Sequence, residues 1–517
     1  MQEEFNLSLD VSDADLKYRL HDSKIGFERE GLRISDIGIS QSKHPKELGS
    51  ALFNEFITTD FSESQLELVT PPHKDKIKAL YFLEDIHHYA YHKIGSEIIW
   101  PFSIPPNFHG DEMIPIADYG SSDLGRFKKL YRSGLAHRYG RIMQAISGIH
   151  YNFSLGKNFW QSDSTPQNDD GLKHLRSRTY LKIIRNLKRI NWMLLYLFGA
   201  SPILSRNLVP PDAKNFCKLN RDAFYLPYAT SLRMSRFGYS NENRDMLNVS
   251  LNSLESYIRD ITEATITPSN HYNSSESSFF ENKVQINNSI LQIDDEYYAI
   301  ARPKSNNTAY KRSTKNLQKG GIDFIEIRSI DINPFSSIGI DEESVLLIEL
   351  LTLYCLFAGN QGISDKEQLE INQNDSTIAE NGRAVNQHLF RNGNRISVAS
   401  WGLELLDEMI PIAEFLDGDG ASYISCISSA REKFLNPDST LSARVIEETV
   451  SKNISFEELG NHLGELHKNQ YIKRPKESNK NWALLERQAK ESIQKLKFEE
   501  LKKRSSLDEI IYNYFHE

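Results

Sequence analysis

The 517-residue sequence predicts an α+β protein built on a largely antiparallel sheet. Long segments with apolar residues at every third or fourth position indicate helices, and short β-branched and aromatic runs that alternate at period two indicate strands. The two kinds of segment follow one another irregularly, unlike the strict strand–helix alternation of a doubly wound fold. We therefore expect helices that flank a sheet of mainly antiparallel strands.

The elements can be placed along the chain from these two periodicities. Helical patterns cover residues 74–95, 126–146, 178–198, 345–358 and 482–503. Extended patterns cover residues 24–34, 64–69, 148–155, 290–300 and 322–330. We expect residues 1–340 to form a catalytic core that contains the sheet. Residues 341–517 are expected to form a mostly helical region packed on that core within one integrated domain, with the polar stretch 361–393 separating the two parts.

The bulk composition is that of an ordinary soluble protein, with 39% hydrophobic and 25% charged residues. The 61 Lys and Arg against 70 Asp and Glu give a formal net charge of -9, which argues against nucleic acid or an anionic membrane as a partner. The most apolar stretch, 345–358, is too short for a membrane span, and the amino terminus lacks a signal-peptide pattern. We expect a soluble, cytoplasmic protein that acts on small molecules.

Several familiar kinds of site are not indicated. Cys217, Cys355 and Cys426 lie far apart without metal-ligand spacing, so we expect small buried residues rather than a disulfide, a zinc site or a nucleophile. His88 and His92 are four residues apart in a helical pattern, but no HExxH glutamate or third ligand accompanies them, and we expect helix-surface histidines. No P-loop or GxGxxG sequence occurs, so neither of those nucleotide sites is supported.

Carboxylates gather on single faces of the expected strands. In GFEREGLRI, residues 26–34, an extended backbone places Glu28 and Glu30 on the same face. In SESQLELVT the same alternation puts Glu67 on one face, and Asp60 lies just upstream in TTDFSE. Two pairs of carboxylates can therefore stand together if these strands are neighbours, which the sequence alone does not decide.

Two further strands add other polar groups. GIHYNFSL places His150 and Asn152 on a polar face, and IDFIEIRSI places Glu326 beside Arg328. A solvated sheet face explains any one of these strands, but crowded carboxylates repel one another unless cations lie among them. Oxygen ligands with one imidazole suit Mg²⁺ or Mn²⁺. The basic segment 304–319 could meet an anionic ligand, although a solvated loop is the commoner explanation.

At this point the sequence resembles the proteobacterial type of glutamate-cysteine ligase. The resemblance is carried by co-linear segments over most of residues 20–340, among them GFEREGLRI, HPKELGSALFNEFITTDFSESQLELVTP, WPFSIPP, YLPYATSLRMSRFGYSN and GGIDFIEIRSIDINPFSSIGID. It implies a glutamine synthetase-like fold, a curved antiparallel sheet flanked by helices whose concave face holds ATP, divalent ions and amino acids. Beyond about residue 345 the likeness fades, and nothing is carried over.

The resemblance also implies roles for individual residues. The metal ligands for two or three Mg²⁺ ions would be Glu28, Glu30, Asp60, Glu67, His150 and Glu326. L-Glutamate would contact Gln144, Asn152 and Arg233, and L-cysteine would contact Phe61, Tyr131, Arg132, Leu135, Tyr239 and Tyr298. Arg328 would face the ATP phosphates, with Glu67 and Arg328 essential for catalysis. Core packing is the alternative for each aromatic residue and for Leu135, and a general base is the alternative for His150.

The implied reaction is the first step of glutathione biosynthesis. ATP would phosphorylate the γ-carboxylate of glutamate, and the amine of cysteine would displace phosphate from the γ-glutamyl phosphate. The alternatives are a ligase that uses another amine, a guanidino kinase on a similar architecture, and a silent relative that only binds ATP and an amino acid. The resemblance further implies a monomer. The stretch 361–393 contains no cysteine, which argues against disulfide regulation in that region.

Overall fold

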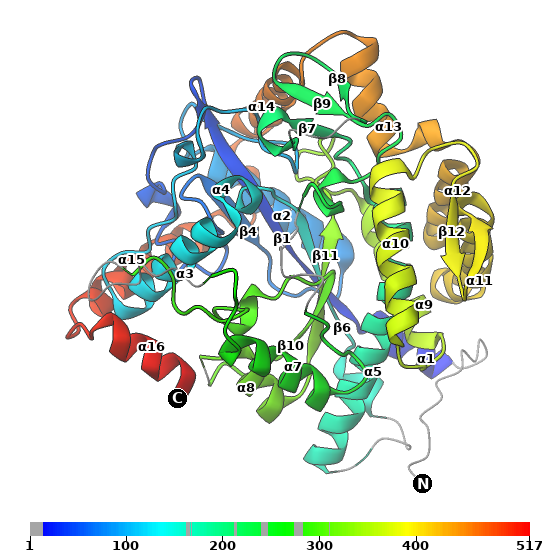
Figure 1. The fold of residues 1–517 in the computed structure, drawn as a ribbon, viewed down its shortest axis with the longest axis horizontal. Helices are drawn as coiled ribbons and strands as arrows, with labels where there is room; N and C mark the ends of the chain where they lie inside the picture. Colours follow the sequence, from blue (N-terminus) through cyan, green and yellow to red (C-terminus); the bar gives the residue numbers. More distant parts are fainter. Residues whose placement is uncertain are drawn as a thin grey trace.

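A central antiparallel sheet organises the protein, as the computed structural model shows (Figure 1). The structure describes residues 14–161, 166, 168–210, 215–238, 247–272, 283–309 and 311–516. Within these residues the main sheet has eight strands, six of them in the order β10-β11-β6-β1-β4-β3, with β2 and β5 also paired to β1. All of its pairings are antiparallel, which confirms the predicted α+β class.

The strands of the main sheet are β1 (Lys24–Ser35), β2 (Gly38–Ile39), β3 (Ile57–Thr59), β4 (Gln65–Val69), β5 (Ile98–Ile99), β6 (Ile149–Ser154), β10 (Ala301–Lys304) and β11 (Phe324–Ile330). Smaller sheets are formed by β7 (Ile203–Ser205), β8 (Cys217–Lys218) and β9 (Ala223–Tyr225), and by β12 (His388–Arg391) and β13 (Asn394–Ser397). Four of the five predicted strands are therefore present.

The strand predicted at 290–300 is wrong. Residues Asp294–Glu296 form a 3-10 turn, and the strand begins only at Ala301. Asp294 is buried and accepts hydrogen bonds from the Arg312 guanidinium and from the Thr314 hydroxyl and backbone N–H. These hydrogen bonds to residues far along the chain stabilise the turn. The local alternation of apolar and polar residues therefore did not predict the structure of this segment.

The helices are α1 (Ala14–His21), α2 (Lys76–Tyr91), α3 (Asp123–Tyr139), α4 (Arg141–Gln144), α5 (Asp169–Arg189), α6 (Asn191–Phe198), α7 (Leu254–Ile266), α8 (Ser313–Gly320), α9 (Glu342–Phe357), α10 (Asp365–Asn381), α11 (Val398–Asp417), α12 (Ser422–Leu435), α13 (Leu441–Ile446), α14 (Phe456–Ile472), α15 (Trp482–Glu500) and α16 (Leu507–His516). All five predicted helical segments contain helix. The segment 126–146 is divided at Gly140, whose φ of 76° is left-handed, and 178–198 is divided at Ile190.

The two faces of the main sheet differ in character. Side chains such as Phe27 and Tyr151 point from β1 and β6 into a large hydrophobic core that also contains residues of α2, α5, α6 and α9. Because side chains alternate along a strand, the intervening residues of the same strands point to the opposite, polar face. That face looks toward α3 and carries the predicted site residues.

The C-terminal part of the chain is continuous with this core. In Figure 1 it runs from yellow to red around the rim of the molecule and ends beside α3. Tyr471 of α14 stacks on Tyr91 of α2 with ring centroids 5.6 Å apart, and Trp401 of α11 lies 4.8 Å from Trp192 of α6. The buried Glu349 accepts hydrogen bonds from Ser23 and Tyr423, so polar contacts also cross the boundary.

Three minor expectations need correction or refinement. The stretch 361–393 is not a separator, because it contains α10, which packs on α6 through the hydrogen bond from Asn191 Nδ2 to Asp375 Oδ2 at 2.9 Å. His88 is not a surface residue but is buried against Tyr471. Cys355 and Cys426 are buried as expected, whereas Cys217 is partly exposed.

No helix in the described part of the chain is long and apolar enough to cross a membrane.

The shared core leads us to propose that residues 1–340 and 341–517 unfold as one unit. Gly460 of α14 packs against Trp100, and a Cβ atom at position 460 would lie 2.0 Å from the indole Cη2. Gly460→Ala should therefore overpack this contact and destabilise the whole protein by about 1–3 kcal/mol. In scanning calorimetry we expect a single transition that moves as a unit to lower temperature. Two resolved transitions, or a shift of only part of the heat absorption, would contradict this proposal.

Candidate active site

A cavity of about 890 Å³ lies against the polar face of the main sheet. Its walls come from the sheet, from one face of α3, and from the last two helices of the chain. It is lined by predicted site residues from β1, β4, β6 and β11 and from the turns and helices beside the sheet. These are Glu28, Asp60, Phe61, Glu67, Tyr131, Arg132, Leu135, Gln144, His150, Tyr298, Glu326 and Arg328.

The strand register brings the predicted ligands together. Glu28 on β1 is the direct partner of His150 on β6, and Glu30 is the partner of Glu67 on β4. On the other side of β6, Glu326 of β11 pairs with Asn152. Four adjacent strands and the turn after β3 thus carry the acidic cluster, defined here as Glu28, Glu30, Asp60, Glu67 and Glu326 around His150.

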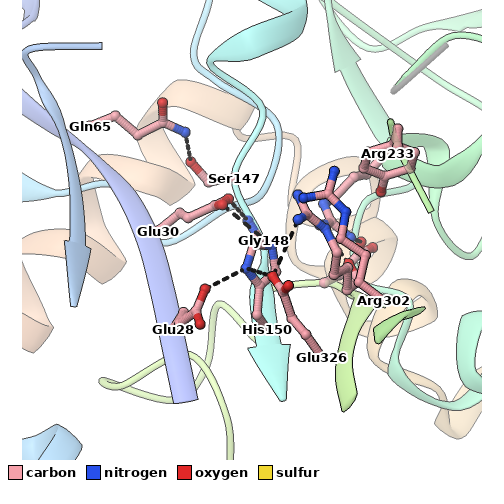
Figure 2. Close-up of polar contacts among 12 residues, drawn as sticks. Glu28, Glu30, Gln65, Ser147, Gly148, His150, Arg233, Arg302 and Glu326 are labelled. Atoms are coloured by element: carbon pink, nitrogen blue, oxygen red, sulfur yellow. Dashed lines mark hydrogen bonds and ion pairs between the residues drawn. The ribbon is translucent and has the colours of Figure 1, made fainter. Parts of the chain in front are cut away.

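His150 lies at the centre of this cluster (Figure 2). Its Nδ1 atom is 3.0 Å from Glu28 Oε2 and 3.2 Å from Glu326 Oε1, and its Nε2 atom is 3.4 Å from Glu30 Oε1. A neutral imidazole has one donor and one acceptor nitrogen, so it cannot donate to ionised carboxylates on both sides. A proton on the carboxyl of Glu30, whose pKa is raised by burial, or a cation close to one ring nitrogen would satisfy this arrangement.

The carboxyl groups of the cluster differ in the direction in which their pKa values are shifted. Burial and the nearby Glu28, Asp60 and Glu30 raise the pKa of Glu67 well above its usual range. Burial would also raise the pKa of Glu326, but the positive charges of Lys304 and Arg328 and the ring of His150 hold it well below its usual range. Burial raises the pKa of Glu30 as well, so the cluster contains carboxyls that are harder to ionise until a cation approaches.

A divalent cation would fit this donor set. Glu28, Glu67 and His150 each offer a ligand atom, and these atoms all lie within 4.8 Å of one another. The Glu67 side chain makes no hydrogen bond or ion pair with any described residue, although it lines the cavity. Carboxylate oxygens with one imidazole are donors that Mg²⁺ and Mn²⁺ accept. Without a cation, these carboxylates would repel one another in a partly buried site.

Positive side chains line the cavity beside the acidic cluster. Arg302 and Lys304 come from β10, Arg328 comes from β11, and Lys311 comes from the segment after β10. We call these four residues the cationic edge. Lys304 Nζ is 3.0 Å from Glu326 Oε2, and Arg328 Nη1 is 3.2 Å from Glu326 Oε1. Such guanidinium and ammonium groups bind phosphate oxygens well. Lys304 and Lys311 of the basic segment 304–319 thus line the cavity, and binding of an anionic ligand by this segment stays a prediction.

Three predicted residues lie behind the cavity wall rather than in it. Glu30 accepts a hydrogen bond from the Gly148 backbone N–H at 2.8 Å, and Asn152 Nδ2 donates to Glu28 Oε1 at 2.9 Å. Arg233 is buried, donates to the Arg328 carbonyl at 2.9 Å, and lies 3.7 Å from Asp331. Tyr239 lies outside the described residues.

The sequence as a whole is similar to those of known proteins. The family model for glutamate-cysteine ligase matches residues 9–378. A glutamate–cysteine ligase of Alcanivorax borkumensis is 36% identical over 98% of both chains, and one of Pseudomonas putida is 37% identical over 95% of this chain and 94% of the relative.

The chain belongs to the glutamate-cysteine ligase family.

Solved structures agree with this assignment. The glutamate–cysteine ligase of Francisella tularensis, solved in complex with AMP, superposes with a TM-score of 0.87 at 31% identity and covers 95% of this chain and 97% of that one. A bifunctional glutathione synthetase of Pasteurella multocida has a TM-score of 0.67 at 23% identity, covers 54% of that chain, and shares the fold. The predicted family and α+β fold are thus confirmed.

Some residues of this family member's cavity were missed by the sequence analysis. Lys128 and Tyr139 share the inward face of α3 with Tyr131 and Leu135, so helical spacing could have found them. Glu499, Lys502, Ser505, Ile510, Asn513 and Tyr514 also line the cavity, and they belong to α15, α16 and the link between them. The charged helical pattern at the C-terminal end of the sequence contained no signal that would predict these residues in the cavity.

The close packing of Gly148 and Arg233 allows a test of the expected role of this arginine in glutamate binding. A Cβ at position 148 would lie 2.1 Å from Arg233 Nη2, so Gly148→Ala must displace the guanidinium. A small displacement of a positioning group can cost about a hundredfold in rate. We expect kcat/KM for glutamate to fall by that order while circular dichroism and melting show a folded protein.

The matched control is Gly26→Ala on β1, where the nearest atoms to the new Cβ lie at 3.5 Å, an ordinary contact. This variant should retain its activity. Normal glutamate kinetics in a folded Gly148→Ala protein would refute the expected role of Arg233.

Proposed function

We propose that the protein joins the γ-carboxylate of L-glutamate to the amine of L-cysteine at the expense of ATP, the first step of glutathione synthesis. The observation that carries this proposal is the acidic cluster around His150 directly beside the cationic edge. A site with carboxylates for divalent cations and basic side chains for phosphate suits phosphoryl transfer. Membership of the glutamate-cysteine ligase family supports the choice of substrates.

The acidic cluster would hold two or three Mg²⁺ ions, with Mn²⁺ as a possible replacement. Glu28, Glu67 and His150 would provide ligands to one ion, and Glu30, Asp60 and Glu326 would complete the set. When bound, the ions would neutralise the charge of the phosphate oxygens. Their presence would also relieve the repulsion between the carboxylates, which explains why such a cluster can persist in a folded protein.

The reaction needs activation because a carboxylate is a poor electrophile toward an amine. In the proposed sequence, a γ-carboxylate oxygen of glutamate attacks the γ-phosphorus of ATP, the bond to the β–γ bridging oxygen breaks, and ADP leaves. The cysteine nitrogen then attacks the γ-carbonyl carbon of the γ-glutamyl phosphate and displaces inorganic phosphate. One proton of the amine is lost to solvent. No covalent bond to the protein is required.

The side chains of this protein would position these groups. Arg328, which contacts Glu326 and lies 5.6 Å from the Tyr298 ring, would stabilise the transferring phosphoryl group together with Lys304. Arg233, which was predicted to bind the α-carboxylate of glutamate, would support the glutamate site from behind the wall, where it donates a hydrogen bond to the Arg328 carbonyl. The wall formed by Phe61, Tyr131, Leu135 and Tyr298 would enclose the small side chain of cysteine, with Arg132 at its edge.

An assay of ADP release with L-glutamate, ATP and Mg²⁺, with and without L-cysteine, tests the function. We expect cysteine-dependent turnover, equal amounts of ADP and phosphate, and γ-glutamylcysteine by mass spectrometry. Turnover only with another amine would indicate a related ligase, and ADP without free phosphate would indicate a kinase. Binding of ATP without turnover would indicate a silent relative. We further propose that the protein acts as a monomer in the cytoplasm.

The raised pKa of Glu67 leads to a prediction about stability and activity together. A carboxyl whose pKa is raised by folding destabilises the metal-free protein as the pH rises above the ordinary value of 4.5, because the unfolded chain ionises first. Glu67→Gln cannot ionise, so the metal-free variant should melt at a higher temperature than the wild type at neutral pH. This difference should vanish as the pH falls below about 4.5, the range in which an ordinary carboxyl is protonated.

The same variant should lose more than about a hundredfold in turnover, since even partners of metal ligands cost up to that factor. Thermal melts in a chelator between pH 4 and 8, combined with the ADP assay, provide the measurement. A variant that is folded and fully active would exclude Glu67 from the metal site.

A further inference from the structure

A separate cavity of about 280 Å³ lies between α5, the start of α7 and the segment that follows α9. It shares no lining residue with the cavity of the candidate active site. In the lower part of Figure 1, α5 and α7 lie next to each other. We call this second hollow the α5 cavity.

Basic side chains follow one stripe of α5. Arg178, Lys182, Arg185 and Arg189 succeed one another at intervals of three or four residues, so they lie on the same side of the helix. Arg178 and Arg185 line the α5 cavity. Within the described residues, only Arg189 of these four has a carboxylate partner, Glu367, at 2.6 Å. The stripe therefore carries more positive charge than its surroundings neutralise.

Two of these charges are buried. Arg185 is 5% exposed and Lys182 is 7% exposed. Burial and the positive charges of Arg189 and Arg178 lower the pKa of Arg185 to about 10, and burial and Arg185 lower the pKa of Lys182. A buried charge is costly unless an opposite charge compensates it. An anion in the α5 cavity would supply that compensation.

The hydrogen-bond acceptors around the α5 cavity are already used. Arg185 donates to the Leu251 carbonyl at 2.7 Å and to Asn360 Oδ1 at 2.6 Å. Asn252 Oδ1 accepts from the Ile363 backbone N–H at 3.0 Å. The amide nitrogen of Asn360, by contrast, donates to no described residue, although Asn360 lines the cavity. The polar groups left for a ligand are therefore mainly donors, which suit an anion rather than a cation.

The start of α7 adds to this donor set. Ser253, Leu254 and Glu255 are the N-cap and the first two residues of α7, and all three line the α5 cavity. The first backbone N–H groups of a helix have no acceptor within it and carry partial positive charge. Glu255 is the one acidic residue among those that line the cavity, and it is exposed and forms no ion pair with Arg178 or Arg185. Positive charge thus still exceeds negative charge there.

We propose that the α5 cavity binds a small oxyanion with two negative charges, of which inorganic phosphate is the simplest. Arg178 and Arg185 would bind its oxygens, with the Asn360 amide nitrogen as a further donor. The volume of the cavity equals that of several water molecules, so a tetrahedral ion fits with part of its hydration. This site is distinct from the proposed ligase reaction and does not rest on it.

The test is a calorimetric titration of the whole protein with inorganic phosphate. Mg²⁺ and a non-hydrolysable ATP analogue are present at saturation, so that phosphate does not bind at the acidic cluster. Arg178→Gln is the variant, because Arg178 is exposed and makes no hydrogen bond or ion pair with a described residue, so the fold should not change. We expect the Kd for phosphate to rise about tenfold, the order for one lost charge-assisted hydrogen bond.

The matched control is Arg395→Gln, which removes the same charge from an exposed position on β13 that does not line the α5 cavity. This variant should bind phosphate like the wild type. Phosphate should also raise the melting temperature of the wild type and of Arg395→Gln more than that of Arg178→Gln, because a ligand stabilises the folded state that binds it.

Each other outcome would overturn the site. A wild type that binds no phosphate, or an Arg178→Gln protein with unchanged affinity, would show that the α5 cavity holds no such anion. An equal loss in both variants would indicate a general effect of net charge. The ADP assay of the proposed ligase reaction is independent of these results, since Arg178 lies outside the active-site cavity.

Discussion

The crowding of carboxylates around His150 is the constraint on which the rest of the structure depends. Glu28, Glu30 and Glu326 all lie within 3.4 Å of its ring nitrogens, in a setting where repulsion is poorly screened. Such an arrangement needs a rigid backbone, because mutual repulsion would otherwise drive the carboxylates apart. Four neighbouring antiparallel strands provide this support, and their register sets which side chains meet.

The support for this cluster comes from the opposite face of the same strands. On β1 and β6 the residues that point to the acidic cluster alternate with buried residues that point the other way, among them the apolar Phe27 and Tyr151. The hydrophobic free energy gained on one face therefore offsets the electrostatic cost on the other. Positive charge also contributes, since Lys304 and Arg328 hold Glu326 in its ionised form.

The C-terminal region has two roles in this arrangement. α11 and α14 extend the core behind the sheet through contacts such as Trp192 with Trp401 and Tyr91 with Tyr471. α16 instead lies on the polar side of the sheet, where it lines the cavity and its Tyr514 stacks on Phe127 of α3. A boundary near residue 340 thus divides the sequence but not the cavity, which is lined by residues from both sides of it.

The sequence by itself determined the fold class, four of the five predicted strands of the main sheet, and the pairing of acidic residues on strand faces, because alternation at period two is a local property. The long co-linear resemblance indicated the family, because the order of the motifs is also a property of the sequence itself. Sequence alone could not decide that Glu28 stands beside His150 or Glu30 beside Glu67, because register depends on partners many residues away. Nor could it decide that Asp294 turns instead of continuing a strand, that Arg233 lies behind the wall, or that Asn513 reaches the cavity. Each of these depends on long-range packing, which only the tertiary structure fixes.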